Sequence, residues 1–304
     1  MTSTNWAYVS NYMVYSAMVV YTFAMISAAL EVAMNIKGAK VLVMSSGESA
    51  SEPESGKSER WGRIAISLTS LAFILHLAAV AARAISAHRV PWGNMYEFST
   101  TGSVAVTGMF LLLLRRHSLR WLTLVVTFAV LMTLGTAITL LYRPSAPLVP
   151  ALKSTWLVIH VSAAVISGGV FLLANAVAAA YLYMERIESR GPRPLWAAKI
   201  PSLEVLDRLC YRLVAFVFPL WTFAVIAGAI WAESAWGRYW GWDPKETWAF
   251  ITWVAYAAYL HARATAGWKG KRAAWLCLLA GSSFLFNYVY VNVWGTGKHT
   301  YSGL

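Results

Sequence analysis

The chain has 304 residues, of which 59% are hydrophobic and only 12% are charged, and its formal net charge at pH 7 is +12. A soluble domain carries roughly 25% charged residues, so the composition excludes an ordinary soluble enzyme and indicates an integral membrane protein. The positive charge is spread over short connectors between apolar segments, which is typical of membrane topology and argues against nucleic acid as a partner.

Eight segments are long and apolar enough to cross a membrane as helices, each of which needs about 20 such residues. They cover residues 12–34, 62–84, 97–114, 121–142, 155–184, 209–231, 248–266 and 273–293. These runs are too long and too uniformly apolar for the alternating strands of a β-barrel. The sequence predicts an all-α integral membrane protein, a bundle of about eight transmembrane helices, with residues 1–304 forming a single polytopic membrane domain.

The connectors fall into two sets with unequal charge. One set, at 35–63, 115–120, 186–212 and 263–272, holds 18 Lys and Arg residues, and the other set holds seven. Basic connectors remain in the cytoplasm, so both termini and the connector between the sixth and seventh spans are predicted on the outer side of the cytoplasmic (plasma) membrane.

Two further expectations concern segments near the N-terminus. Residues 1–11 contain no Lys or Arg, so the first span lacks the basic start of a cleaved signal peptide and is expected to be retained. Residues 45–60 are rich in Ser, Glu and Gly and are expected to form a disordered cytoplasmic loop.

The outer connector at 231–248 is rich in tryptophan. Five of the 16 tryptophans fall there: Trp231, Trp236, Trp240, Trp242 and Trp248. Indole combines a flat apolar face with one N–H group, and five indoles give more flat surface than anchoring a helix requires. A planar, mostly apolar ligand with a polar edge, such as heme, would fit this surface.

The same connector contains a signature for the start of a helix. Asp243 would be the N-cap, Pro244 the first helical residue, and Glu246 the third residue after the cap. Asp243 is therefore either purely structural or part of the ligand surface.

Two of the six histidines are predicted on the outer side beside the tryptophans. His160 follows a candidate N-cap, Ser154, at the outer end of the fifth span, and His299 lies in the C-terminal tail. Histidine is the usual axial ligand of heme iron, so the two would form a bis-histidine heme site. The alternatives are a helix-end histidine and a solvated tail residue.

The other histidines are more ambiguous. His261 is 13 residues beyond Trp248, about 20 Å along a helix, and would either bind a second heme at an inner position or point to the cytoplasmic interface. His76 is interpreted as a buried histidine bonded to a neighbouring helix and His117 as a topology residue, while His88 stays undecided. Cys210 and Cys277 form no CxxC motif and are interpreted as packing residues.

Three of the seven outer basic residues lie close to the candidate heme site: Arg238, Lys245 and Lys298. They would pair with heme propionates or, as the alternative, with Glu233, Asp243 or Glu246. A second outer connector, residues 91–98, combines Pro and Gly with aromatic residues and is expected to lie on the membrane or re-enter it.

At these residues the sequence resembles a known family. Residues 231–263, WAESAWGRYWGWDPKETWAFITWVAYAAYLHAR, look like the WWD signature of CcsA (ResC) cytochrome c biogenesis proteins. Pro91, Asn94, Tyr96 and Glu97 are similar to that family's first outer loop. The ending Gly297 to Tyr301 resembles its terminal Gly-Leu-His-Ser-Tyr, with Lys298 and Thr300 in place of Leu and Ser. The Asp-Pro-Lys-Glu-Thr-Trp run favours the CcsA type over the related CcmC and CcmF types.

The resemblance implies a function. With a ResB/Ccs1-type membrane subunit, such proteins carry heme b from the inner to the outer face and hold it at the WWD surface. They present it to the CxxCH motif of apocytochrome c, whose thiols depend indirectly on thiol-reducing proteins. By motif, His160 and His299 match the outer iron ligands and His261 matches a ligand of the inner heme. The chain lacks a fused ResB-like portion, so enzymatic activity as a holocytochrome c synthase of the heme lyase type is expected only in a complex.

Three alternatives remain at this stage. A b-type heme electron carrier would place paired histidines on facing helices, whereas here they lie at a helix end and in a tail. A non-heme transporter with aromatic gates, or a purely structural subunit, would purify without Soret absorption.

Overall fold

The computed structural model describes residues 2–44, 53–145 and 152–299. All the regular secondary structure in this part of the chain is helical. Its α-helices are α1 (Ser3–Met44), α2 (Pro53–Ala87), α3 (Met95–Leu114), α4 (Thr123–Thr139), α5 (Thr155–Glu188), α6 (Leu203–Trp236), α7 (Pro244–Ala264) and α8 (Lys271–Trp294). Two short 3-10 helices, η1 (Arg120–Leu122) and η3 (Leu195–Ala197), complete the described elements.

The predicted helical bundle is confirmed, and each predicted span falls on one of the eight α-helices. Seven helical segments are long and apolar enough to cross a membrane, among the described residues. Helix α7 is not one of them, since it carries Lys245 and Glu246 in its first turn and His261 and Arg263 in its last. The protein is a multi-pass membrane protein.

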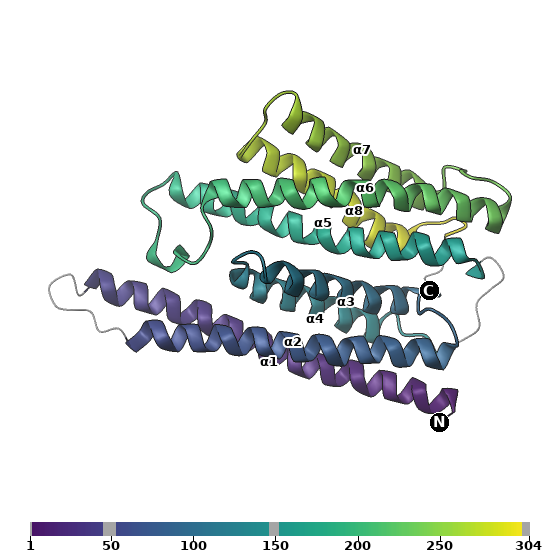
Figure 1. The fold of residues 1–304 in the computed structure, drawn as a ribbon, viewed down its shortest axis with the longest axis horizontal. Helices are drawn as coiled ribbons and strands as arrows, with labels where there is room; N and C mark the ends of the chain where they lie inside the picture. Colours follow the sequence, from purple (N-terminus) through teal and green to yellow (C-terminus); the bar gives the residue numbers. More distant parts are fainter. Residues whose placement is uncertain (1, 45–52, 146–151, 300–304) are drawn as a thin grey trace.

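The helices form two groups that lie side by side (Figure 1). Helices α1 to α4 make one group, with α1 packed along α2, and α5 to α8 make the other, with α5 packed along α6 and α7 along α8. Contacts of α3 with α5 join the groups. In the second group, Phe171 of α5 stacks on Tyr256 of α7 with ring centroids 3.8 Å apart, so α5 is fixed against α7 as well as α6.

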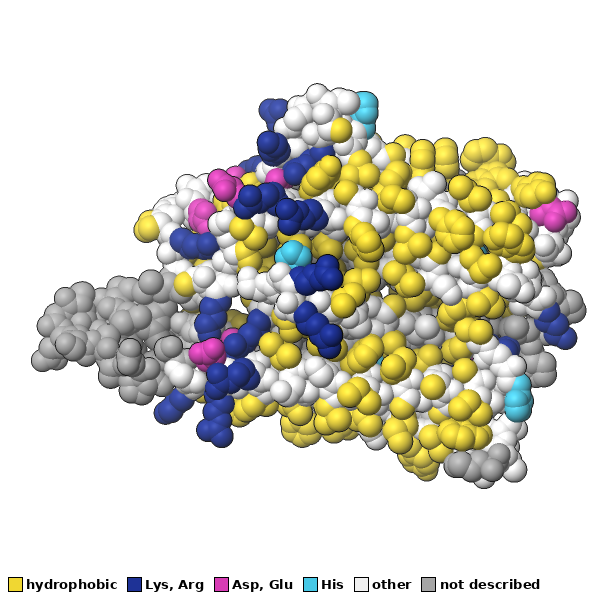
Figure 2. Space-filling model, viewed as in Figure 1, with side chains coloured by type: hydrophobic (Ala, Val, Ile, Leu, Met, Phe, Trp, Pro, Cys, Tyr) yellow, Lys and Arg dark blue, Asp and Glu magenta, His cyan; other side chains and the backbone are white. Residues whose placement is uncertain are grey.

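The two ends of the bundle differ in charge. The start of α1, the end of α8 and the α6–α7 connector lie at the same end (Figure 1). On the face shown in Figure 2, most Lys and Arg side chains gather toward the opposite end. This separation agrees with the two connector sets that the sequence distinguishes, while the membrane side of each end stays a prediction.

Two predicted loops are shorter in the structure. Of the expected loop 45–60, residues 45–52 lie outside the described part, but residues 53–60 begin α2. Ser58 is buried there and donates a hydrogen bond to Asn35 of α1 at 2.6 Å, so packing against α1 accounts for the helix. The Trp-rich connector predicted at 231–248 is reduced to residues 237–243, because α6 continues to Trp236 and α7 starts at Pro244.

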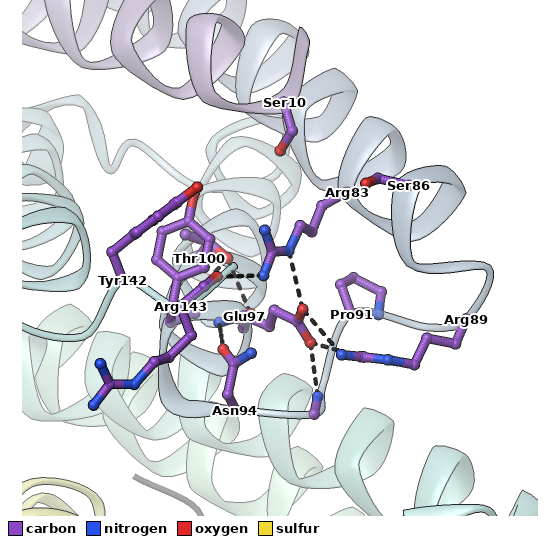
Figure 3. Close-up of polar contacts among 12 residues, drawn as sticks. Ser10, Arg83, Ser86, Arg89, Pro91, Asn94, Glu97, Thr100, Tyr142 and Arg143 are labelled. Carbon is purple, nitrogen blue, oxygen red and sulfur yellow. Dashed lines mark hydrogen bonds and ion pairs between the residues drawn. The ribbon is translucent and has the colours of Figure 1, made fainter. Parts of the chain in front are cut away.

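The connector at 91–98 is likewise partly helical, and its carboxylate has a structural role (Figure 3). Glu97, in the first turn of α3, is fully buried and pairs with Arg83 at 3.0 Å and with Arg89 at 2.7 Å. It also accepts the backbone N–H of Gly93 at 2.8 Å, and Asn94 caps the helix by accepting the N–H of Glu97. Glu97 thus holds the α2–α3 connector against both helices.

We expect Glu97→Gln to destabilise the protein by about 3 kcal/mol or more, because it leaves the buried Arg83 guanidinium facing a neutral amide. Denaturation of the purified protein in detergent measures this. The matched control is Glu59→Gln, whose partner Arg63 lies 3.9 Å away in an exposed pair and which should cost less than about 1 kcal/mol. Equal losses in the two variants would contradict the structural role of Glu97.

Candidate functional site

The tryptophans of the connector region do not form one flat wall. Trp231 and Trp236 lie on α6 and pack together at 4.9 Å between ring centroids. Trp240 and Trp242 form a second pair at 5.8 Å within the connector. Trp248 packs on Phe286 of α8 at 4.1 Å. The structure therefore divides the predicted indole surface into three parts, of which the α6 pair lies beside the histidines.

His160 lies in the second turn of α5, which begins at the predicted N-cap Ser154. Its Nδ1 donates to the backbone carbonyl of Ala224 on α6 at 2.8 Å, and its ring is parallel to Trp231, with 6.1 Å between centroids. Gly228 permits this approach, because a Cβ at that position would lie 2.7 Å from His160 Cε1. The carbonyl fixes the tautomer, so that Nε2 is the unprotonated nitrogen of the neutral ring.

His299 is held by the carboxylate of Asp243. The His299 Nδ1 donates to Asp243 Oδ1 at 3.1 Å, and the ring packs edge-on against Trp236 at 4.7 Å and Trp231 at 5.6 Å. Trp231 therefore contacts both histidine rings. An imidazole whose Nδ1 donates to a carboxylate or a backbone carbonyl is the arrangement usual in metal-binding histidines, and both histidines have it.

Asp243 also organises the backbone around the site. It is the N-cap of α7, accepting the N–H of Lys245 at 3.0 Å, and it accepts the N–H of Lys298 at 2.7 Å. Glu246 completes the predicted capping box. Burial alone would raise the pKa of Asp243, but the hydrogen bonds from His299, Lys245 and Lys298 outweigh it and lower the pKa to about 2. Asp243 is therefore ionised at neutral pH.

The two histidines line the same cavities. One, of about 60 Å³, lies among α5, α6 and the start of α7 and is also bordered by Trp240, Lys245 and Glu246. A neighbouring cavity of about 100 Å³ shares His160, Lys245 and His299 and extends to Trp92 in the α2–α3 connector. Both are smaller than the roughly 300 Å³ at which pockets for drug-sized ligands begin, so a large planar ligand requires the exposed side of the site to open.

The side chains of the three basic residues near the site do not form ion pairs with Glu233, Asp243 or Glu246, the acidic residues considered from the sequence. Lys245 donates to Asn292 Oδ1 at 2.8 Å, Lys298 Nζ lies 6.0 Å from the Trp236 ring centroid, and the Arg238 guanidinium lies over Gly241. None of the ion pairs among the described residues involves these three cations. Burial lowers the pKa of Lys245, which lines both cavities, to about 7, so this side chain is only partly charged at neutral pH.

Three predicted site residues are placed away from the cavities. Trp242 is 68% exposed and has a left-handed backbone, with φ of 56°, and Trp248 packs between helices. His261 is exposed near the end of α7, at the opposite end of that helix from Asp243. The structure thus brings His160, His299, Trp231, Trp236, Trp240 and Asp243 together and leaves His261 at a separate position.

Two residues of the site, Gly228 and Asn292, were not singled out from the sequence, and Gly297 was noted only as part of the family-like ending. Gly228 admits the His160 ring, Gly297 admits the Asp243 carboxylate, since a Cβ there would lie 2.1 Å from Oδ2, and Asn292 holds Lys245. The sequence could have pointed to Asn292, because it is a polar residue inside an apolar span, and to Gly297, because it lies beside His299. The sequence could not have pointed to Gly228, because the residue that it admits, His160, lies on another helix.

Comparison with known proteins places this chain in a class. Residues 92–299 match the family model described as cytochrome C assembly protein. A protein of Gloeothece citriformis named cytochrome c biogenesis protein CcsA is 38% identical over 275 residues, covering 74% of this chain and 83% of that protein. A Picosynechococcus protein of the same name is 34% identical over 299 residues, covering 79% and 87%.

Two further comparisons cover less of the matched protein. The CcsA protein of Guillardia theta is 42% identical over 177 residues, which is 53% of this chain and 59% of that protein. The solved structure of cytochrome c heme lyase CcmF has the same fold at a TM-score of 0.62 and 18% identity, covering 95% of this chain and 50% of the lyase.

The chain is therefore a helical membrane protein of the cytochrome c assembly class. Within that class it belongs to the CcsA-type cytochrome c biogenesis proteins.

We expect Gly228→Ala to destabilise the protein by about 1 kcal/mol, because the new methyl group displaces His160 from the Ala224 carbonyl. His160→Ala should remove the clash, so the double variant should lose less than the sum of the two single losses. Denaturation in detergent measures all three. Gly135→Ala, with no neighbour within 4 Å of the new Cβ, is the control and should not destabilise. Strictly additive losses would exclude the contact.

The low pKa of Asp243 predicts how the attachment of the tail depends on pH. Because folding lowers this pKa from an ordinary value of about 3.9 to about 2, its stabilising contribution is complete above pH 4 and is lost as the pH falls toward 2. Fluorescence of the Trp236 region, compared between wild type and Asp243→Asn, should show a wild-type transition below pH 4. A wild-type transition centred near pH 6 would show that another group controls the attachment.

Proposed function

We propose that this protein binds heme b between His160 and His299 at the outer face of the cytoplasmic membrane and presents it to apocytochrome c. The observation that carries the proposal is that both imidazoles line the same cavities, each with its Nδ1 held by an acceptor. The relatives' role in cytochrome c biogenesis and the name of the heme lyase neighbour support heme as the substrate.

The donor set fits this substrate. Two imidazoles suit the axial positions of heme iron, and Trp231, Trp236 and Trp240 supply flat apolar surface. Lys298 and Arg238 are cations suited to propionates, and a propionate beside Lys245 would favour its protonated form. The cavities are smaller than a porphyrin, so binding requires Tyr239 and Trp240 of the connector, of which Tyr239 is 62% exposed, to move outward.

The residues of this chain act by holding and orienting the heme. Asp243 and the Ala224 carbonyl keep both rings in the tautomer that coordinates through Nε2. In the attachment reaction, the S–H of each CxxCH cysteine adds across one heme vinyl group, so the new C–S bond needs no oxidant and no leaving group. One protein imidazole would have to yield as the CxxCH histidine approaches, and His299, which lies outside the helices, is better placed to move than His160 within α5.

The proposal extends to transport and to partners. His261 would contribute to an inner heme site together with a ResB-type subunit, since it is exposed on α7 and far along that helix from Asp243. In this account the chain is a heme-handling subunit of a cytochrome c synthase complex, whose apocytochrome substrate is kept reduced by separate thiol-reducing proteins. Enzymatic activity then belongs to the complex.

We expect His160→Ala and His299→Ala each to lower the heme content of the complex purified with its partner and the yield of holocytochrome c. Added imidazole should partly restore both, because it replaces the missing ligand. Pyridine hemochrome and Soret spectra measure the heme. The control is His88→Asn, at an exposed position with φ of 53° that asparagine tolerates. Wild-type heme content and yield in both alanine variants would defeat the proposal.

A further inference from the structure

A second polar cavity lies at the end of the bundle opposite the candidate heme site. It has a volume of about 410 Å³ and is formed where the chain leaving α3 meets the first turns of α6. Its polar lining consists mainly of three arginines and a histidine, Arg116, His117, Arg208 and Arg212. No Asp or Glu is among the described residues that line it. Figure 2 shows Lys and Arg side chains gathered around a histidine in this half of the molecule.

The protein does not neutralise these guanidinium groups itself. Five other cations in this half pair with carboxylates: Arg120 and Lys199 with Glu31, Arg193 with Glu188, Arg263 with Asp207, and Lys271 with Glu185. Exposed arginines such as Arg186, Arg190 and Arg272 form no ion pair among the described residues, but they do not surround a common cavity. The ion pairs and side-chain hydrogen bonds within the described ranges do not include Arg116, Arg208 or Arg212. Three like charges around one hollow repel one another, so an external anion would stabilise the arrangement.

The cavity continues into an apolar surface. Leu119 and Leu209 form part of its wall and are buried in the main core. Val205, Phe216 and Phe223 of α6 are spaced 11 and seven residues apart. This spacing places them on one face of the helix, together with Arg212. All three are exposed, Phe216 by 69%. An anion bound here would thus have an apolar track beside it.

We propose that this cavity binds the anionic head group of a membrane phospholipid. The phosphate is held by Arg116, Arg208 and Arg212, and an acyl chain lies along Val205, Phe216 and Phe223. Basic pockets at the cytoplasmic ends of membrane helices are suited to such head groups, and guanidinium binds phosphate through two parallel hydrogen bonds. The cavity exceeds the size of a phosphate group, and the apolar track suits an amphiphile better than a free anion.

Native mass spectrometry of the purified full-length protein tests the site. After delipidation, phosphatidylglycerol and phosphatidylcholine with the same acyl chains are titrated separately. We expect one phosphatidylglycerol to bind tightly and phosphatidylcholine to bind more weakly. The triple variant Arg116→Gln, Arg208→Gln, Arg212→Gln should bind phosphatidylglycerol about 100-fold more weakly, at the strength expected for three cations near a membrane surface.

The matched control removes three exposed arginines that do not line the cavity, Arg186→Gln, Arg190→Gln and Arg272→Gln, and should retain tight binding. If the triple variant fails to fold, Arg208→Gln and Arg212→Gln singly should each weaken binding about fivefold. Equal binding of the two lipids, or equal losses in the two triple variants, would overturn the site. Displacement of the lipid by hemin but not by hemin dimethyl ester would assign the cavity to porphyrin carboxylates and overturn the lipid assignment.

Discussion

The carboxylate of Asp243 is the contact on which the candidate site depends. It caps α7 through the N–H of Lys245, holds the tail through the N–H of Lys298, and orients the His299 ring. These three donors come from two segments more than 50 residues apart in the sequence. His299 lies beyond the last described helix, so these hydrogen bonds, together with its packing on Trp231 and Trp236, position its ring. The structural and functional interpretations of Asp243 are therefore not alternatives.

The wall of the site opposite Asp243 is formed by α5, α6 and the α2–α3 connector. His160 reaches the Ala224 carbonyl only because α5 and α6 pack closely at Gly228. The α2–α3 connector, held by the buried pairs of Glu97 with Arg83 and Arg89, brings Trp92 to the cavity beside both histidines. Buried ion pairs add little net stability but are costly to break, and here they fix the α2–α3 connector against the ends of α2 and α3.

Much of this architecture could be predicted from the sequence. Runs of about 20 apolar residues located the helices, the Asp-Pro-Lys-Glu pattern predicted the start of α7, and the distribution of Lys and Arg separated the two ends. The division of the tryptophans could not be predicted, because spacing along the chain does not show that Trp248 faces Phe286 or that Trp242 faces outward. The role of Glu97 also depended on Arg83, which lies on another helix.

The proposed function requires that Asp243 hold His299 so that it and His160 share one iron. Electron paramagnetic resonance of the ferric complex, purified with its partner subunit, tests this claim. The wild-type protein should give a low-spin signal of two axial imidazoles. In Asp243→Asn, an amide N–H₂ replaces an oxygen that accepts the Lys298 or His299 N–H, so His299 should no longer be held at the iron. This variant should give a high-spin signal, which added imidazole converts to low spin. An unchanged low-spin signal in Asp243→Asn would contradict the claim.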